Sequence, residues 1–297
     1  MKTKIFNNKF LIALSFAIGT SSCVPDTIDG DGNGLTPTNS DASFTVTKTS
    51  ENHYRLTSSN NNYISSKWDI GIGTFSPGPN VYDIFLPDEG TYDIGHQIIG
   101  QGGIVGGTAT QKITVEKNDP KAGNLIKGGK FMDATDVAKW SLTFANPNGT
   151  DGFALWTWGA GSATFTATKW NRNVMYQAVE VVEGRKYQAD AIVSSKSGVS
   201  DSWFEIYVGY KKPTANEDYT GDGTDSSWLR GINTWAGSGK EPFTKAKISV
   251  VGSKNSNNPD GYFTATKTGT AYFAIRSGGN DMKDGITITS VEFRGVN

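Results

Sequence analysis

Two tryptophans separated by a single residue, Trp156 and Trp158, are the starting point for the chemistry of this chain. Residues two apart in an extended segment share a face, so we expect the two indole rings side by side. The segment 152–168 around them contains no histidine, cysteine or acidic residue. Aromatic faces without catalytic groups suit a flat, uncharged ligand such as a sugar ring, whose C–H bonds pack on the indole. The alternative is that one or both rings belong to a hydrophobic core, and the pattern leaves both interpretations open.

The strand expected at 202–210 supplies a second set of candidates. Its apolar residues alternate with Trp203, Glu205 and Tyr207. Because alternate residues of a strand point to opposite faces, these three side chains line the surface opposite to the core if the apolar face is the buried one.

A long insertion, 211–241, follows this strand and contains Trp228 and Trp235. A long loop in a compact domain is usually functional or disordered, and two tryptophans argue against disorder, so we expect a binding loop. A sugar site also needs a few polar groups around its aromatic floor. The candidates for that role are Gln177, Arg276 and Asn280, with ordinary solvated side chains as the alternative.

The elements that must position these side chains are all expected to be strands. Short alternating runs between glycine-marked turns predict a small immunoglobulin-like β-sandwich over 42–117. After it, no segment keeps a helical period over three turns, and a series of short strands predicts a larger jelly-roll β-sandwich over 118–297. The predicted fold class is therefore all-β. We expect the strands of the second domain at 163–168, 174–182, 186–193, 202–210, 243–251, 261–266, 270–276 and 286–293.

The first domain resembles a polycystic-kidney-disease (PKD) domain. The resemblance rests on the run Trp68-Asp-Ile-Gly-Ile-Gly73 and on the segments 89–92 and 113–115. The family's usual aromatic and acidic residues in that run are replaced by Ile70 and Ile72, which makes this a divergent member. The resemblance implies that the domain acts as a spacer.

The same domain contains the only two histidines of the chain. We expect His53 and His96 at the surface, because they are far apart in sequence. Trp68 is expected in the core, and Gly71 and Gly73 are expected to form a tight turn.

The second domain resembles a family-4-like carbohydrate-binding module. Six pieces in order support this, namely 124–131, Trp140, 176–179, 183–187, 269–273 and 286–293. The resemblance implies a jelly roll that binds a polysaccharide, with Trp140 in the core; the place of Trp170 stays undecided. Lys130 and Thr289 stand where the family often has acidic ligands for a structural calcium ion. No cofactor is therefore expected, and the weak calcium candidates are Asp133, Asp222 and Asp225.

The N-terminus resembles a bacterial lipoprotein signal peptide. A basic start, a short apolar run at 10–18 and small residues before Cys23 predict that residues 1–22 are removed and that Cys23 is lipidated. An ordinary secretory signal is the alternative. Residues 23–41 are polar and predict a flexible tether. Their early aspartates resemble the export signal of Bacteroidetes surface lipoproteins, which implies a lipid anchor in the outer membrane with the protein facing outward.

The composition of the chain limits the classes of ligand that it can bind. The net charge of the 297 residues is -1 and the basic residues are scattered, which argues against nucleic acid and against strongly anionic polymers. Cys23 is the only cysteine, so the sequence excludes internal disulfides. A neutral polysaccharide is expected, with a β-1,3-glucan of the laminarin type as the first candidate by extension from the module family.

Three functions remain open. The first is a non-catalytic surface glycan-binding lipoprotein that serves an outer-membrane glycan transporter complex in a polysaccharide-uptake system. The second is a jelly-roll glycoside hydrolase, which needs two carboxylates at a fixed separation. Glu205 with Asp222 or Asp225 is the only pair to nominate, and no catalytic signature surrounds it. The third is an adhesion or structural lipoprotein whose exposed indoles bind proteins. The order of anchor, tether, spacer and sandwich favours the first, so no enzyme activity is expected.

Overall fold

The computed structural model describes residues 41–100, 103–145 and 152–296. The expected signal peptide, the lipidation site at Cys23 and the tether up to residue 40 lie outside these ranges. Within them, no helix is long and apolar enough to cross a membrane. Spatial proximity divides the described residues into two compact units. The smaller comprises those up to Thr47, in Arg55–Asp83 and in Asp93–Lys112, and the larger those in Lys48–Tyr54, in Ile84–Tyr92 and from Ile113 onward. The domain bounds 42–117 and 118–297 stay a prediction.

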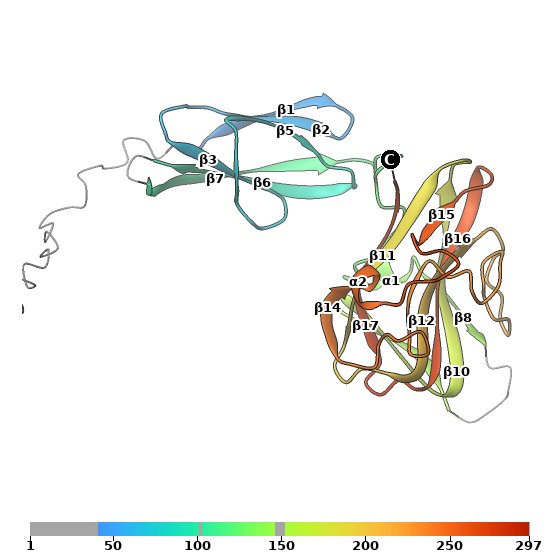
Figure 1. Ribbon diagram of the computed structural model, residues 1–297. Coiled ribbons are helices and arrows are strands. Elements are labelled where there is room, and N and C mark those ends of the chain that lie inside the picture. The colour runs from blue at the N-terminus through green and yellow to red at the C-terminus, as the bar shows by residue number, and fades with distance from the viewer. Residues whose placement is uncertain (1–40, 101–102, 146–151, 297) are drawn as a thin grey trace, which may run out of the picture. The chain divides into compact units, whose positions relative to one another are not determined.

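The first part of the described chain forms two small sheets (Figure 1). One has three strands in the order β1-β2-β5 and the other four in the order β4-β3-β6-β7. The strands are β1 (Phe44–Ser50), β2 (His53–Ser58), β3 (Ser65–Ile70), β4 (Ser76–Gly78), β5 (Val81–Phe85), β6 (Gly90–Ile99) and β7 (Val105–Val115).

Trp68 lies in the core of the smaller unit, as predicted. Its ring is 2% exposed and stacks on His96 with ring centroids 4.0 Å apart. The predicted turn after it is also present. Gly71 and Gly73 have positive φ angles, and one carboxylate oxygen of Asp69 accepts hydrogen bonds from the backbone N–H groups of both glycines at 3.0 Å.

His96 is buried, so the expectation of a surface position is wrong for this residue, whereas His53 is exposed. The reason is the period of β6, which places His96 on the same face as Ile94 and Ile98, both fully buried. Its Nδ1 lies 2.7 Å from the carbonyl oxygen of Ala42, and burial lowers its pKa.

The larger unit is built on one curled sheet of ten strands in the order β13-β12-β16-β10-β17-β11-β14, with β8 and β9 paired to β10 and β15 paired to β11. Two four-residue helices accompany it, α1 (Ala134–Val137) and α2 (Ile248–Val251). The strands are β8 (Ser141–Ala145), β9 (Ala154–Gly159), β10 (Ser162–Val181), β11 (Lys186–Ser195), β12 (Ser200–Gly209), β13 (Arg230–Asn233), β14 (Phe243–Lys247), β15 (Tyr262–Thr264), β16 (Gly269–Asp281) and β17 (Ile286–Gly295).

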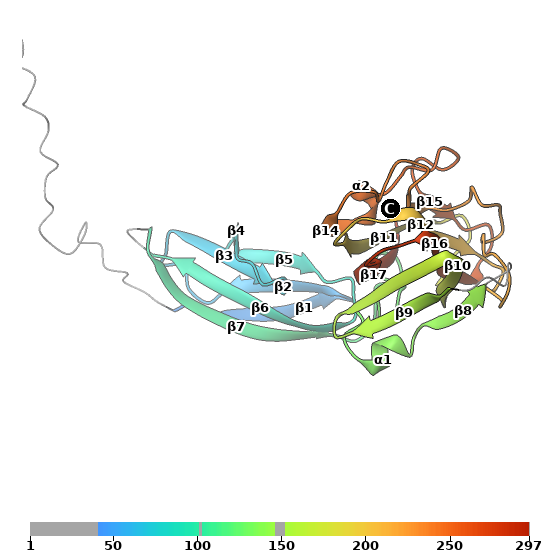
Figure 2. The same ribbon diagram turned by 90° about the horizontal axis from the view of Figure 1, so that it is seen from below.

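The 20-residue strand β10 joins the two layers of this unit. Its first part pairs with β9 and β17, and its second part, from Thr168 onward, pairs with β16 and β8 (Figure 2). Between the layers lies a continuous core that includes Phe165, Phe204, Phe273 and Phe293, all with no exposed surface. The all-β fold class is therefore confirmed. The strands expected at 163–168 and 174–182 are one strand, and the segment expected to be a strand to residue 251 becomes α2 after Lys247.

The Trp156–Trp158 pair faces this core, so of the two interpretations left open by the sequence the core position is correct and the nomination of the pair as a binding surface is wrong. Both rings share one side of β9, as predicted, with centroids 6.3 Å apart. That side packs inward, because the residues opposite them on β10 are Phe165 and Ala163, both fully buried. Trp156 is only 4% exposed, and Trp158 is partly buried against the same core. Trp140 is in this core too, as predicted.

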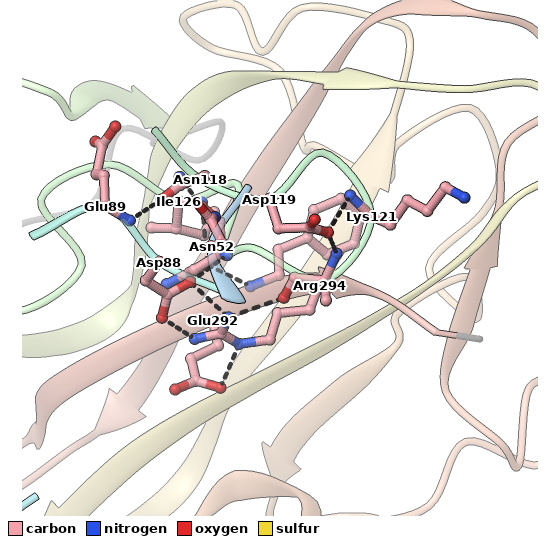
Figure 3. Close-up of polar contacts among 12 residues, drawn as sticks. Asn52, Asp88, Glu89, Asn118, Asp119, Lys121, Ile126, Glu292 and Arg294 are labelled. Carbon is pink, nitrogen blue, oxygen red and sulfur yellow. Dashed lines mark hydrogen bonds and ion pairs between the residues drawn. The ribbon is translucent and has the colours of Figure 1, made fainter. Parts of the chain in front are cut away.

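A network of polar contacts within the larger unit joins Asp88 to the last strand, β17 (Figure 3). The guanidinium of Arg294 binds both carboxylate oxygens of Asp88, each at 2.7 Å, and contacts Glu292 at 3.1 Å. Asp88 also accepts a hydrogen bond from the backbone N–H of Asn124 at 2.8 Å. Burial acts to raise the pKa of Asp88, but Arg294 and the Asn124 N–H outweigh it and hold the pKa below its ordinary value.

Candidate functional site

A cleft of about 570 Å³ opens on the outer face of the layer formed by β13, β12, β16, β10 and β8. Three of the predicted binding tryptophans line it, namely Trp203, Trp228 and Trp235. Strand residues form its floor, while the insertion 211–241 and the segment 254–257 form its walls. The cleft therefore unites one strand and one loop that the sequence had nominated separately.

Trp203 lies on the floor of the cleft, with its ring close to Gly278. It stands opposite Gly278 on the neighbouring strand β16, and a Cβ added to that glycine would come within 2.6 Å of the indole ring. A side chain at position 278 would thus displace the ring. The indole N–H of Trp203 is buried and has no hydrogen-bond partner among the described residues. The half-buried ring lines the cleft, so it can offer aromatic surface, but not its N–H, to a ligand.

Trp235 is 58% exposed and stands in the turn after β13. The side-chain oxygen of Asn233 accepts hydrogen bonds from the backbone N–H groups of Trp235 and Ala236, at 3.0 and 3.1 Å, which fixes the turn. The side-chain amide of Asn233 in turn donates to Glu205 Oε1 at 2.8 Å. The buried carboxylate of Glu205 therefore holds Asn233, and Asn233 in turn fixes the turn that carries the exposed indole.

Glu205 and Arg276 form a buried ion pair under the cleft. Arg276 Nη2 lies 2.8 Å from Glu205 Oε2, and both side chains are almost fully buried. Arg276 Nη1 contacts Asp225 at 2.8 Å and Asp218 at 3.4 Å, so one guanidinium ties two residues of the insertion to the sheet. The hydroxyl of Tyr207 donates to Glu205 at 3.0 Å.

The pKa shifts of this cluster follow from burial and charge. Burial raises the pKa of Tyr207, and the negative charge of Glu205 raises it further, so its hydroxyl stays protonated. Burial acts to lower the pKa of Arg276, but the negative charges of Glu205 and Asp218 and the hydrogen bond to Asp225 raise the pKa above its ordinary value. Arg276 therefore stays charged and Tyr207 stays neutral.

The charges that line the cleft balance. Three are cationic and three are carboxylates, namely Arg172, Arg276 and Lys254 against Glu205, Asp218 and Asp225. Most of them are bound to one another, since Arg172 also contacts Asp218 at 3.2 Å. The cleft offers aromatic faces and amide groups without a net field of either sign, which fits a ligand without net charge.

Two of the predicted ligand-binding residues, Tyr207 of β12 and Trp228 of the insertion, are instead packed between the insertion and the sheet. Tyr207 is fully buried and Trp228 is 7% exposed, and together with Tyr219, Val174 and Ala274 they form a second, smaller core on this face of the sheet. The alternation of the strand correctly separated its two faces, but it could not show that the insertion folds back over one of them. Trp228 still borders the cleft.

The remaining candidates lie elsewhere or have other partners. The side chain of Gln177 is buried and exchanges two hydrogen bonds with the backbone of Lys127, so its role is structural. Asn280 is exposed near the end of β16 and does not line the cleft.

The three aspartates proposed as weak calcium ligands each bind a different partner within the protein. Asp133 caps α1, Asp222 accepts hydrogen bonds from the backbone N–H groups of Tyr210 and Lys211, and Asp225 binds Arg276. Within the described residues, no three His, Cys, Asp or Glu side chains gather in a way that could hold a metal ion.

Sequence reasoning missed Arg172, Asp218 and Asn233. Arg172 shares its face of β10 with Val174, but the strand changes register just before it, between Thr168 and Asn171, which hides the alternation. Asp218 and Asn233 belong to the insertion, whose path no periodicity predicts. An asparagine two residues before an exposed tryptophan was the one usable signal, because asparagine favours turns of this kind.

No protein-family model matches the sequence, and no curated protein is significantly similar to it. Solved structures match at low similarity. One, from a study of promiscuous specificity in carbohydrate-binding modules of the β-sandwich superfamily, has a TM-score of 0.28 and 13% identity over 86% of this chain and 99% of its own. A structure from work on CBM4 structure and function has a TM-score of 0.34 and 13% identity, over 58% and 99%. TmCBM61 in complex with β-1,4-galactotriose has a TM-score of 0.29 and 13% identity, also over 58% and 99%. Similarity at this level decides nothing about the ligand, so the site is interpreted from its own residues.

Proposed function

We propose that this protein binds a neutral polysaccharide without cleaving it, and that the cleft around Trp203 and Trp235 is the binding site. One observation supports this above the others: two indoles, the exposed one of Trp235 and the half-buried one of Trp203, line a cleft whose charged side chains balance. Sugar rings present C–H faces to aromatic rings and hydroxyls to amides and charged groups. The exposed side chains of Lys254, Ser256 and Asn257 lie at the cleft for the second purpose.

The carboxylates of the cleft favour binding over hydrolysis. A glycosidase needs one carboxylic acid free to donate a proton and a second carboxylate free to attack or to activate water. Arg276 lies between Glu205 and Asp225 and binds both. Glu205 also accepts hydrogen bonds from Tyr207 and Asn233 and its side chain is almost fully buried, so it is poorly placed to act on a substrate.

Calorimetric titration of the purified protein with laminarin, mixed-linkage glucan, xylan, mannan and alginate tests this proposal. We expect binding of at least one neutral polymer, with laminarin as the first candidate. Trp235→Ala should weaken that binding at least tenfold, because aromatic anchors contribute about 2 kcal/mol or more each. Its melting temperature should stay nearly unchanged, since the side chain is largely exposed.

Phe85→Ala is the matched control, because Phe85 is an exposed aromatic residue, 37% accessible, that does not line the cleft. It should bind as the wild type does. Heat of binding with alginate alone, and with none of the neutral polymers, would contradict the proposal of a neutral ligand. Equal affinity of Trp235→Ala and the wild type would show that the binding site is not this cleft. Absence of binding to every glycan, together with capture of a protein partner through Trp235, would support the adhesion alternative.

We propose further that the protein is a surface lipoprotein, anchored through Cys23 in the outer membrane, that delivers glycan to a transporter complex. The lipoprotein-like N-terminus supports this, since an acyl anchor needs only that cysteine and a tether. Cys23→Ala should shift the protein from the outer-membrane fraction to the soluble fraction. Unchanged fractionation and unchanged surface labelling of the variant would refute the anchor.

A further inference from the structure

Trp170 has a backbone conformation that tryptophan rarely adopts. Its φ angle is 66°, and that of Lys169 before it is 53°. Both lie in the left-handed region, which is unfavourable for residues that carry a Cβ. The register of β10 against β16 shifts between Thr168 and Asn171, so the two residues form a β-bulge.

The topology accounts for the bulge but not for the tryptophan. The bulge lies where β10 passes from its pairing with β9 to its pairing with β16, and strands that cross between layers commonly bend at bulges. Glycine or asparagine would adopt the same conformation with less strain. Strained residues that persist are concentrated at functional sites, which directs attention to what the ring of Trp170 contacts.

The ring of Trp170 continues the aromatic surface of the cleft. It is 46% exposed and stacks on Trp235, with ring centroids 6.0 Å apart and planes inclined by 26°. Trp235 in turn lies 6.2 Å from Trp203 on the cleft floor. Trp170 itself does not line the cleft. A row of three indoles therefore runs from the floor, through Trp235, to a ring outside the cleft.

We infer that Trp170 forms an additional subsite beyond the cleft, and that the ligand is accordingly a chain long enough to fill the cleft and continue over this ring. The inference rests on the proposed function and deepens it. A monosaccharide or a short oligosaccharide that only fills the cleft gains nothing from Trp170. A longer chain gains one more sugar–indole contact, so affinity depends on Trp170 only above a certain chain length.

The row of rings admits a second role for Trp170, which the same experiment separates. If Trp170 only supports Trp235 from behind, its removal disturbs Trp235 and weakens ligands of every length equally. If it is a subsite, its removal weakens long ligands alone. Trp235→Ala provides the reference, because loss of that ring weakens every length under both roles.

The experiment is a titration of the full ectodomain with β-1,3-linked gluco-oligosaccharides from the disaccharide to the heptasaccharide. Wild type, Trp170→Gly, Trp170→Asn, Lys169→Gly and Trp235→Ala are compared. For both Trp170 variants we expect unchanged affinity for the shortest oligosaccharide that the wild type binds, and a loss of at least tenfold for the heptasaccharide. Lys169→Gly relieves the strain at the other residue of the same bulge and keeps the ring, so it should bind every length as the wild type does.

Thermal melts of the same variants supply a second readout. Trp170→Gly should melt at or above the wild-type temperature, because the glycine removes strain that the tryptophan imposes on the bulge. Equal losses at all lengths, or a heptasaccharide affinity that Trp170→Gly leaves unchanged, would overturn the subsite. A wild type that binds no oligosaccharide of the series and no laminarin would instead refute the β-glucan assignment, and the subsite would fall with it.

Discussion

The buried charge cluster under the cleft allows a prediction in which stability and binding separate. Arg276→Met removes the partner of Glu205, a carboxylate whose side chain is 3% exposed. Removing one member of a buried ion pair costs about 3–5 kcal/mol, because the remaining charge stays uncompensated. At roughly 2–4 °C for each kcal/mol in a unit of this size, the melting temperature should fall by about 6–20 °C.

A second variant identifies the cause of that loss. In Arg276→Met/Glu205→Leu the fully buried carboxylate is gone, Asp225 is 76% exposed and can be solvated, and Asp218 keeps its ion pair with Arg172. Apolar replacement of a whole buried pair is often neutral, so we expect the double variant to recover most of the lost stability, to within about 1 kcal/mol of the wild type. It should still bind glycan poorly, because Glu205 no longer accepts the hydrogen bond from Asn233 that positions Trp235.

The assay is chemical denaturation and glycan titration on the same samples. Lys211→Met serves as the control, because its ion pair with Glu217 is exposed on both sides and should contribute about 0–1 kcal/mol. A double variant as unstable as Arg276→Met would show that lost packing of the side chains, and not an uncompensated charge, causes the loss of unfolding free energy. A double variant that binds as tightly as the wild type would refute the positioning of Trp235 through Glu205 and Asn233.

Two further predictions concern residues outside the cleft. Trp156→Ala should cost about 3–5 kcal/mol of unfolding free energy while the folded fraction keeps its glycan affinity, since the ring is in the core; a melting temperature close to that of the wild type, with lost binding, would restore Trp156 to the binding surface. Asp88→Asn should be less stable than the wild type at neutral pH. Because the folded pKa of Asp88 is lowered, its contribution is fully present above the ordinary aspartate pKa of about 3.9 and is lost as the pH falls through the folded value. Denaturation of both proteins between about pH 2 and pH 7 checks this, and a stability difference that does not change with pH would contradict it.

Local patterns in the sequence were sufficient for the fold class and for part of the core. The period of two along the chain, with glycine at the turns, identified most of the longer strands, and the core positions of Trp68 and Trp140 followed from the resemblances to known domain families. Alternation also placed Trp156 with Trp158, and Trp203 with Glu205 and Tyr207, on common faces. These are relations between residues a few positions apart, which the geometry of an extended backbone determines by itself.

Tertiary structure alone decided which of those faces is covered. Trp156 is buried because β9 pairs with the part of β10 whose residues point into the core, and Tyr207 is buried because the insertion folds back over its strand. Trp235 is exposed because Asn233, held by Glu205, turns the chain outward. In each case the outcome depends on contacts between segments distant in sequence. Alternation shows which side chains share a face of a strand, but burial is decided by what packs against that face.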